Sequence, residues 1–511
     1  MTSVIIGLDV GTTAVKAVAF AVGDPATSAT HSPLAESQAE QVTTQPEPGW
    51  QVQDLGQVLA AVDSALSRCA ADLPRHTEVL GVSLSVALHA LIGLDADCVA
   101  LTPVITWADG RSAEDAAWIR THHDPVELLH RSGTPVHPMS PMVKLRWITR
   151  EEPELSRRVR WWVGLKEVVL HHLTGTLAAE ISCGSASGLL DVRTRQWDPQ
   201  AAELAGISTD RLADVVSTTT RFELASACAN RVGLAVGCPV VIGAGDGPLG
   251  NLGTGAIVPG VVGLSLGTSG AARMIMDGPT FDPDGRLFSY ALTDDLWVSG
   301  GAISNGASAI HWAARMFAPE IAGQDGADTV LLDRAARLPA GADGVLALPF
   351  VLPERSPMDP GLTATVAGLR FDHGPEHAVR ATIEGVCRQV AVIVTTLNSI
   401  TPVEAIRATG SPFGHPLWQQ VMAGHLDAPM VVPSSAGGTA LGAAALGAYA
   451  LGVADSLPAA LAALGGPVGT GDVLAVPVDP ADAQVYRTAS GRAAELLESY
   501  LLVAESWTAT G

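Results

Sequence analysis

Two segments that lie half a chain apart begin in the same way, and this repeat constrains the fold more than any other feature of the sequence. IIGLDVGTTAVKAV begins at Ile5 and VVGLSLGTSGAARM begins at Val261, an offset of 256 residues (261 − 5). Each segment has the pattern of a strand, a small polar turn and a second strand, which is typical of a β-hairpin. The pattern is common, but the shared turn chemistry and the half-chain offset favour duplication over coincidence. The sequence therefore predicts two related domains with a cleft between them.

The turns of the two hairpins are rich in groups that bind phosphate. Glycine and hydroxyl positions correspond in the two copies, namely Gly11 with Gly267, Thr12 with Thr268 and Thr13 with Ser269. Backbone N–H groups and hydroxyls in such turns can hold the phosphates of one nucleotide from two sides. Asp9 of the first copy is replaced by Ser265 in the second. The extra carboxylate can face a hydrated Mg²⁺, although an ordinary Asx turn is the simpler explanation for Asp9 taken alone.

The rest of the chain alternates strand and helix patterns, which predicts α/β layers. Asp54 is typical of an N-cap, and we expect an amphipathic helix from there to about Leu73. Residues 79–85 have the pattern of a strand. The apolar run 436–464 is dominated by Gly and Ala rather than by large apolar residues, so it indicates a buried helix and not a membrane span.

Composition excludes several classes of partner. The formal net charge is −22, which argues against a nucleic acid or an acidic membrane surface as partner. The six cysteines include no CxxC pair, so we expect reduced thiols of a cytosolic protein. The first residues have no basic region followed by an apolar stretch, so no signal peptide is expected and the predicted location is the cytoplasm.

One carboxylate lies in a segment that otherwise has only small or uncharged residues. Residues 241–255 read VIGAGDGPLGNLGTG, and Asp246 is the one charged residue among them. GDGPLG formally fits the G-x-G-x-x-G pattern of a dinucleotide site. The acidic partner expected about 20 residues later is missing, because the next acid is Asp277, so a dinucleotide oxidoreductase is disfavoured. Asp246 is then either a structural turn residue or a group that faces a ligand.

A third glycine-rich segment, ATGSPFGHPLWQQVMAGH from Ala408, predicts a strand, a glycine turn and a helix. A nucleotide can lie against such a turn, since helix N-termini favour anions. A tight packing corner between strand and helix is the alternative. Pro412 removes one backbone donor from the turn.

Seven segments, in order, resemble the FGGY family of carbohydrate kinases, and the resemblance covers nearly the whole chain. They are GLDVGTTAVK, MSPMVKLRWITRE (139–151), GDGPLGNLGTG, LSLGTSG, GGAISNGAS (300–308), LPERSPMDPGLTATVAGL (352–369) and ATGSPFGHPLWQQVMA. The resemblance implies an α/β fold of two actin-like, ribonuclease H-like domains, which we expect at residues 1–247 and 248–511. It also implies phosphorylation of a sugar hydroxyl by MgATP, with Asp246 as the general base.

The resemblance also implies where the nucleotide and the metal bind. Asp9 and Asp246 are expected to bind Mg²⁺ through water. The residues expected to bind ATP are Gly11, Thr12, Thr13, Lys16, Gly267, Thr268, Ser269, Gly301, Asn305, Gly410, Ser411 and Phe413.

The acceptor is expected to be a small sugar or sugar acid. The residues expected to bind it are Leu88, His89, Trp107, Asp109, Arg111, Asp246 and Gly247. ITWADGRS and GDGPLGNLG resemble the gluconate kinases of the family more than its xylulokinases, so gluconate is favoured and D-xylulose is second. Arg111 or Lys166 can then meet the carboxylate of the acceptor. Without the family segments, an exposed ion pair and a core histidine explain Asp109, Arg111 and His89 as well.

Two other hypotheses belong to different classes. One hypothesis is a catalytically idle actin-like protein that binds nucleotide. Such a protein has no physical need for a general base such as Asp246. The other hypothesis is the oxidoreductase disfavoured above. The expected partners are a small-molecule substrate and, by analogy, a second copy of the chain in a homodimer.

Overall fold

The chain folds into two units, each built from several stretches of sequence. A computed structural model describes residues 2–23, 33–324, 326–355, 362–433, 438–467 and 475–508, with side chains as far as Leu502. The first unit comprises Met1–Val258, Ile275–Ser299 and Ser435–Gly469, and the second comprises Pro259–Met274, Gly300–Ser434 and Thr470–Gly511. The units are therefore discontinuous in sequence, while the predicted family boundary at 247/248 stays a prediction.

The first unit contains most of the short elements. Its strands are β1 (Ser3–Val10), β2 (Ala14–Ala21), β3 (Ala35–Glu40), β4 (Val52–Gln53), β5 (Glu78–Val86), β6 (Ile92–Leu94), β7 (Val104–Ile105), β8 (Trp161–Val163), β9 (Ala179–Glu180), β10 (Leu190–Asp191), β11 (Gln196–Trp197), β12 (Val215–Val216), β13 (Arg221–Glu223), β14 (Pro239–Gly245) and β17 (Phe288–Ala291). Its helices are α1 (Leu55–Ala71), α2 (Ala113–His122), α3 (Pro125–Ser132), α4 (Pro141–Glu151), α5 (Pro153–Arg158), α6 (Leu165–Thr174), α7 (Ile181–Ser185), α8 (Pro199–Leu204), α9 (Ser226–Val232), α10 (Asp246–Gly253), α15 (Gly438–Ala450) and α16 (Leu457–Ala463).

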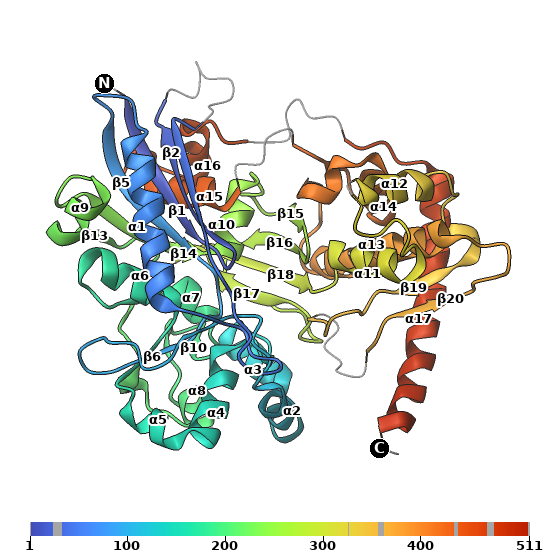
Figure 1. Cartoon of the computed structure of the whole chain (residues 1–511), viewed down its shortest axis with the longest axis horizontal. Helices are drawn as coiled ribbons and strands as arrows, with labels where there is room; N and C mark the ends of the chain where they lie inside the picture. Colours follow the sequence, from blue (N-terminus) through green and yellow to red (C-terminus); the bar gives the residue numbers. More distant parts are fainter. Residues whose placement is uncertain are drawn as a thin grey trace. The chain divides into compact units, whose positions relative to one another are not determined.

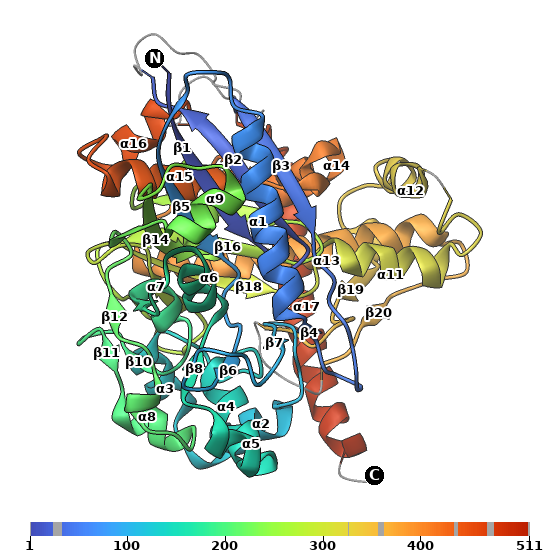
Figure 2. The ribbon, with the colours of Figure 1, turned by 60° about the vertical axis from the view of Figure 1, so that its left-hand side comes forward.

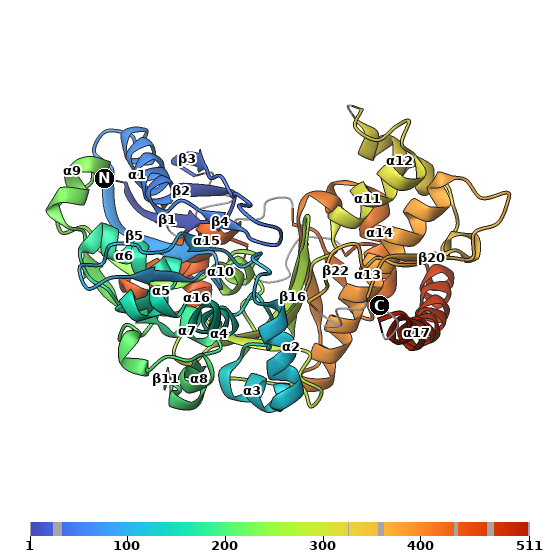
Figure 3. The same cartoon turned by 60° about the horizontal axis from the view of Figure 1, so that its bottom comes forward.

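The second unit is richer in long helices. Its strands are β15 (Val261–Leu266), β19 (Leu346–Leu348), β20 (Thr365–Ala367), β21 (Ala405–Thr409) and β22 (Met430–Val431). The chain changes unit within β16 (Gly270–Met276) and within β18 (Trp297–Ile303). Its helices are α11 (Ala307–Phe317), α12 (Ala327–Ala335), α13 (Pro375–Ile400), α14 (Pro416–His425) and α17 (Pro480–Thr508). Figure 3 shows α11, α13, α14 and α17 gathered together within this unit.

The sheet of the first unit has the strand order β13-β14-β5-β1-β2-β3. Strands β1 and β2 form an antiparallel hairpin, and β5 runs parallel to β1 (Figure 1). The hairpin and the strand near residues 79–85 confirm the sequence prediction. Because β14 also runs parallel to β5, the carboxyl ends of β1, β5 and β14 meet at one edge of the sheet.

Helices cover both faces of this sheet, which explains why β1 is apolar at successive positions rather than at alternate ones. Val4, Ile6 and Leu8 share a buried cluster with residues of α1, whereas Ile5 is buried among residues of α15. Figure 2 shows α1 crossing one face of the sheet. Asp54 caps α1 as predicted, because its carboxylate accepts the backbone N–H of Gln57.

The Ala-rich run forms two buried helices, α15 and α16, and its first two residues, 436 and 437, lie outside the described part. Small residues are needed here because backbones approach closely. A Cβ on Gly7 would lie 2.0 Å from the carbonyl oxygen of Ala440, and one on Gly442 would lie 1.9 Å from that of Leu249. Among the described residues, no helix is both long enough and apolar enough to cross a membrane.

The central strands of the second unit repeat the pattern of the first. Strand β15 pairs antiparallel with β16 and parallel with β21, as β1 pairs with β2 and β5. The predicted duplication is therefore confirmed in the topology of the strands as well as in the sequence.

Candidate functional site

Two carboxylates converge at the carboxyl edge of the first sheet. Asp9 lies near the end of β1, and Asp246 begins α10 directly after β14. The Ser85 hydroxyl donates to Oδ1 of Asp9 at 2.9 Å. Burial and the negative charge of Asp246 raise the pKa of Asp9 to about 6. Asp9 pairs with Ser85 of β5 and Gly245 pairs with the next residue, Val86, so Asp9 and Asp246 stand at the same end of the sheet.

The glycines around Asp246 are explained by close backbone contacts. Gly243 has φ +71°, and a Cβ there would lie 1.8 Å from the carbonyl oxygen of Leu84. A Cβ on Gly245 would lie 2.3 Å from the Leu88 side chain. Oδ1 of Asp246 accepts the N–H of Gly247 at 2.8 Å and that of Leu88 at 3.3 Å. The turn therefore fixes the orientation of one carboxylate at the start of a helix, where a negative charge is favoured.

The first hairpin turn is tied to a loop that follows β7. Nε1 of Trp107 donates to Oγ1 of Thr12 at 3.1 Å, and the Gln53 amide donates to the Thr12 carbonyl at 2.7 Å. Thr13 and Lys16 are exposed, and Lys16 lies opposite Asp9 in the register of the hairpin. The structure thus brings Trp107, predicted to contact the acceptor, to a turn predicted to contact phosphate.

His89 is oriented by groups that no sequence pattern singles out. Its backbone has φ +66°, a left-handed conformation that is uncommon outside glycine. Its Nδ1 lies 2.8 Å from the carbonyl oxygen of Ala186, so Nδ1 carries a proton and donates to that oxygen. The ring meets Tyr290 edge to face, with centroids 5.7 Å apart.

Asp109 and Arg111 pair with each other and are buried, which corrects the alternative of an exposed ion pair. Their contact with the acceptor stays a prediction. Nε and Nη2 of Arg111 both lie 2.8 Å from the Asp109 carboxylate. Only 4% of the arginine side chain and 0% of the aspartate side chain are exposed. The guanidinium also lies 3.5 Å from the ring centroid of Trp50. These contacts give Arg111 a structural role.

The amine of Lys166 also donates hydrogen bonds to backbone carbonyls. Its Nζ donates to the carbonyls of Leu84, Ile242 and Ala244 at 3.2, 2.9 and 2.7 Å, and only 1% of the residue is exposed. The amine therefore joins the ends of β5 and β14 just before Asp246. This geometry corrects the expectation that Lys166 meets the acceptor carboxylate.

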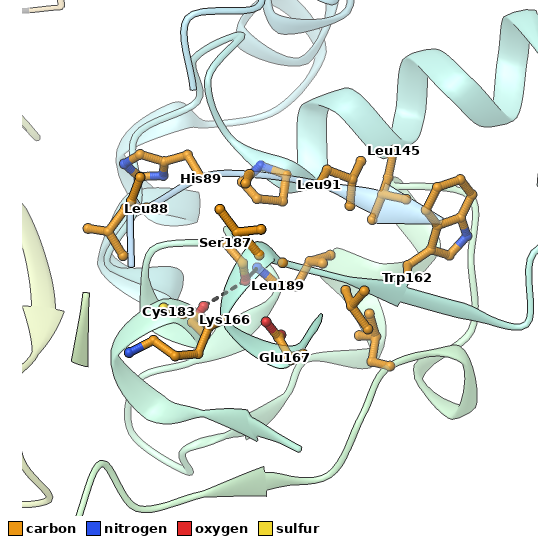
Figure 4. Close-up of a pocket in the computed structure, with 18 of the residues that line it drawn as sticks. Leu88, His89, Leu91, Leu145, Trp162, Lys166, Glu167, Cys183, Ser187 and Leu189 are labelled. Atoms are coloured by element: carbon orange, nitrogen blue, oxygen red, sulfur yellow. Dashed lines mark hydrogen bonds between the residues drawn. The ribbon is translucent and has the colours of Figure 1, made fainter. Parts of the chain in front are cut away.

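A small cavity adjoins the segment that bears His89. Its volume is about 40 Å³, room for about three waters. Figure 4 shows Leu88 and His89 at one end and Trp162 at the other, with Glu167 between them. Oε2 of Glu167 and Nε1 of Trp162 have no hydrogen-bond partner among the described residues. The cavity is therefore polar enough and large enough to hold water.

Glu167→Gln is expected to stabilise the protein at high pH and to change little at low pH. Burial raises the pKa of Glu167 to about 7 from its ordinary 4.5. Between these values the native state keeps a proton that the unfolded state has lost, so the free energy of unfolding falls as the pH rises. The glutamine removes this penalty, which is on the order of 3 kcal/mol above pH 7.

Thermal or urea unfolding at pH 5, 6.5 and 8 measures this difference. Glu203→Gln, which changes an exposed acid of the same unit, is the matched control. A stabilisation by Glu167→Gln that is the same at all three values would contradict the assignment.

The second hairpin turn, residues 267–269, is braced by the start of α11. Gly306 and Ala307 donate their N–H groups to the carbonyls of Thr268 and Gly267 at 3.0 and 2.8 Å. The Ser308 hydroxyl donates to Thr268 as well, at 2.9 Å. A Cβ on Gly306 would lie 2.6 Å from the Gly267 carbonyl oxygen, so only glycine fits. Sequence reasoning missed Gly306, although it lies in the segment GGAISNGAS.

The turn after β21 lies against the same hairpin. Gly410 has φ +121°, and a Cβ there would lie 1.7 Å from the carbonyl oxygen of Leu266. Ser411 is exposed, whereas only 2% of Phe413 is exposed. Gly410 and Ser411 are thus placed beside the second hairpin turn, and Phe413 supports that region from inside.

Gly301 and Asn305 have structural roles within the second unit, and their assignment as nucleotide contacts stays a prediction. The Asn305 amide is fully buried, donates to Leu352 and Glu354 at 2.9 and 2.7 Å, and accepts the Leu352 N–H. A Cβ on Gly301 would lie 2.8 Å from Ile393 of α13. Residues 356–361 of the predicted segment 352–369 lie outside the described part.

A surface hollow of about 590 Å³ lies beside Ser308, between α11 and α12. His311, Arg315 and Asp328 contribute to its lining. Its size is within the range of small-molecule sites, and Ser308 connects it to the turn at Thr268.

Known proteins resemble the chain over most of its length. Residues 4–253 match the N-terminal domain and residues 262–451 match the C-terminal domain of the FGGY family of carbohydrate kinases. A gluconokinase of Bacillus subtilis (strain 168) is 36% identical over 470 residues, 90% of either chain. A xylulose kinase of Escherichia coli (strain K12) is 27% identical over 82% of this chain and 84% of its own. The crystal structure of gluconate kinase from Lactobacillus acidophilus, 26% identical, covers 100% of both chains with a TM-score of 0.90.

Proposed function

Because this chain belongs to the FGGY family of carbohydrate kinases, we propose that it transfers the γ-phosphoryl group of ATP to D-gluconate, giving 6-phosphogluconate and ADP. The observation that carries the choice of acceptor is the 36% identity to a gluconokinase over 90% of both chains. D-xylulose is the second candidate, since the xylulose kinase relative is 27% identical over a smaller share of the chain. Cytoplasmic location and a homodimer stay predictions.

Asp246 is the proposed general base. A carboxylate is a weak base toward an alcohol, so it accepts the hydroxyl proton late, as the new O–P bond forms and the bond to the leaving ADP breaks. The N–H groups of Leu88 and Gly247 on Oδ1 support this role, because they fix the direction of the carboxylate. Positioning and electrostatics then supply most of the rate enhancement.

The residues at the carboxyl edge of the first sheet fit a magnesium ion. Mg²⁺ prefers oxygen ligands and keeps several waters, and Asp9 with Asp246 offers two adjacent carboxylates. When bound, the ion would neutralise charge on the phosphates. Asp9 and Asp246 are the residues proposed to hold it.

The nucleotide is proposed to bind at the glycine turns. The proposed ATP residues are Gly11, Thr12, Thr13 and Lys16 of the first unit and Gly267, Thr268, Ser269, Gly410 and Ser411 of the second. Support comes from the bracing of the second turn by α11 and from the approach of Gly410 to Leu266. The hollow beside Ser308 has room for a nucleoside.

The acceptor is proposed to bind along the segment that bears Leu88 and His89. The imidazole of His89 can hydrogen-bond a sugar hydroxyl, and the Trp107 ring can pack on a C–H face. Gly247 lies beside the base through the N–H that it donates to Asp246.

ADP release with MgATP and a panel of acceptors tests the proposal. We expect kcat/KM for gluconate to exceed that for D-xylulose, L-ribulose or glycerol by at least about tenfold, since each polar mismatch in a buried site costs about 1 kcal/mol or more. A preference for a ketose would keep the kinase and overturn gluconate. Nucleotide binding without turnover of any acceptor would favour the idle actin-like protein instead.

A further inference from the structure

Lys144 is a buried amine that joins two separate loops. It lies on α4, is one of three lysines in the chain, and is 0% exposed. Its Nζ donates to the backbone carbonyls of His89 and Thr106, each at 2.7 Å. The first carbonyl belongs to the loop between β5 and β6 (residues 87–91), and the second belongs to the loop between β7 and α2 (residues 106–112).

These two loops bear Leu88, His89 and Trp107, which are proposed to bind the acceptor, and each loop also touches the proposed catalytic centre. The N–H of Leu88 in the first loop donates to the Asp246 carboxylate. Trp107 in the second loop donates to Thr12 of the hairpin turn. The amine of Lys144 therefore sets the spacing between the 87–91 and 106–112 loops. Each of these loops is also hydrogen-bonded to a residue of the proposed catalytic centre.

Packing alone does not require a lysine at this position. Its neighbours on the buried face of α4 are apolar, among them Met142, Val143 and Leu145. Burying an amine costs free energy unless it is hydrogen-bonded, and burial lowers the pKa of Lys144 to about 7. Neutral or charged, the amine has N–H groups for both carbonyls. One of these belongs to His89, whose left-handed backbone needs support from its surroundings.

We propose that Lys144 is a positioning residue for the acceptor: it aligns the 87–91 and 106–112 loops so that the acceptor hydroxyl meets Asp246. The inference rests on the proposed function, because it assigns these loops to a sugar or sugar-acid acceptor. It predicts that the residue acts on acceptor affinity through His89 and Thr106 without touching the substrate.

Lys144→Met tests the proposal, because methionine fills similar space without donating. We expect the KM for the acceptor to rise at least about tenfold, with a smaller fall in kcat and a KM for ATP within about twofold of the wild type, since two hydrogen bonds to one loop pair are lost. Thr149→Val is the matched control on the same helix. The Thr149 hydroxyl donates to the carbonyl of Ala205, in a loop with no proposed site residue.

An unchanged acceptor KM, or equal changes in the KM values for acceptor and ATP, would overturn the proposal. So would the same increase in Thr149→Val. If the wild type uses D-xylulose rather than gluconate, the gluconate assignment fails, and the same ratios measured with D-xylulose still decide the role of Lys144. A wild type that phosphorylates no acceptor contradicts both proposals.

Amine labelling of the wild type tests the proposal even if Lys144→Met fails to fold. A fully buried amine reacts only after local opening. An acceptor that binds the two closed loops, at about ten times its Kd, should slow labelling of Lys144 about tenfold. The labelling is done without nucleotide, so exposed Lys16, which is proposed to bind ATP and not the acceptor, serves as the internal reference and should react at an unchanged rate. A labelling rate of Lys144 that is the same with and without the acceptor would overturn the proposal.

Discussion

Asp246→Asn is expected to lower kcat for phosphorylation of the acceptor by about 10² to 10⁴-fold, the usual contribution of a positioned general base. The amide can still accept the N–H groups of Leu88 and Gly247 through its oxygen. The turn should therefore keep its geometry. The amide cannot act as a base, so nothing at this position accepts the proton of the acceptor hydroxyl. Steady-state ADP release at saturating ATP and acceptor measures the change.

The matched control is Asp427→Asn, which alters an aspartate whose side chain is 88% exposed. It should leave kcat within about twofold, because exposed substitutions of this kind change little. The melting temperature of Asp246→Asn should be no lower than that of the wild type, because the change removes the repulsion between Asp246 and Asp9. The affinity for ATP measured without Mg²⁺ should be unchanged, since Asp246 is proposed to hold the ion. A variant that retains more than about one tenth of the wild-type kcat would contradict the assignment of the base.

Gly410→Ala is expected to destabilise the second unit and to weaken nucleotide binding. The added Cβ would lie 1.7 Å from the Leu266 carbonyl oxygen, and φ +121° is strained for any residue with a side chain. The backbone must move, and it lies beside the hairpin turn that is proposed to hold phosphate. We expect a loss of about 3 kcal/mol or more in stability and at least about a tenfold rise in the Kd for ATP.

Gly414→Ala is the control from the same short turn. A Cβ on Gly414 would meet no atom of the described residues within 4 Å, and the φ of Gly414 is not positive. This change should therefore cost less than about 0.5 kcal/mol. Calorimetric titration with ATP and thermal unfolding separate the two variants. Equal affinities and melting temperatures in both would show that Gly410 does not position the turn.

Local signals in the sequence were sufficient for much of the fold. The hairpin β1–β2, its counterpart β15–β16 and the cap at Asp54 depend on neighbouring residues, and their patterns are visible in a short window. The Ala-rich run predicted buried helix because it is apolar but lacks the large apolar residues of a membrane span. Its division into α15 and α16 and the discontinuous units depend on contacts between distant segments, which have no such local pattern.

The candidate site was only partly predictable for a related reason. Asp9 and Asp246 stood out as single acids in small-residue turns, and the structure brings their carboxylates together. Lys144 and Lys166 bind backbone carbonyls. Every residue has a backbone carbonyl, so the sequence does not indicate which residues these lysines bind. The sequence also did not decide whether Arg111 and Asp109 form a buried ion pair, because a short polar turn is compatible with an exposed pair and with a buried one.

Phosphoryl transfer itself is the most direct test of the account. The purified protein is incubated with ATP labelled in the γ-phosphate, with and without gluconate, and the labelled products are separated. We predict that the label appears on gluconate in equal amount to the ADP formed, and that ADP formation depends on gluconate. Label found only in inorganic phosphate, or ADP formation that is the same without gluconate, would contradict the assignment of this chain as a gluconate kinase.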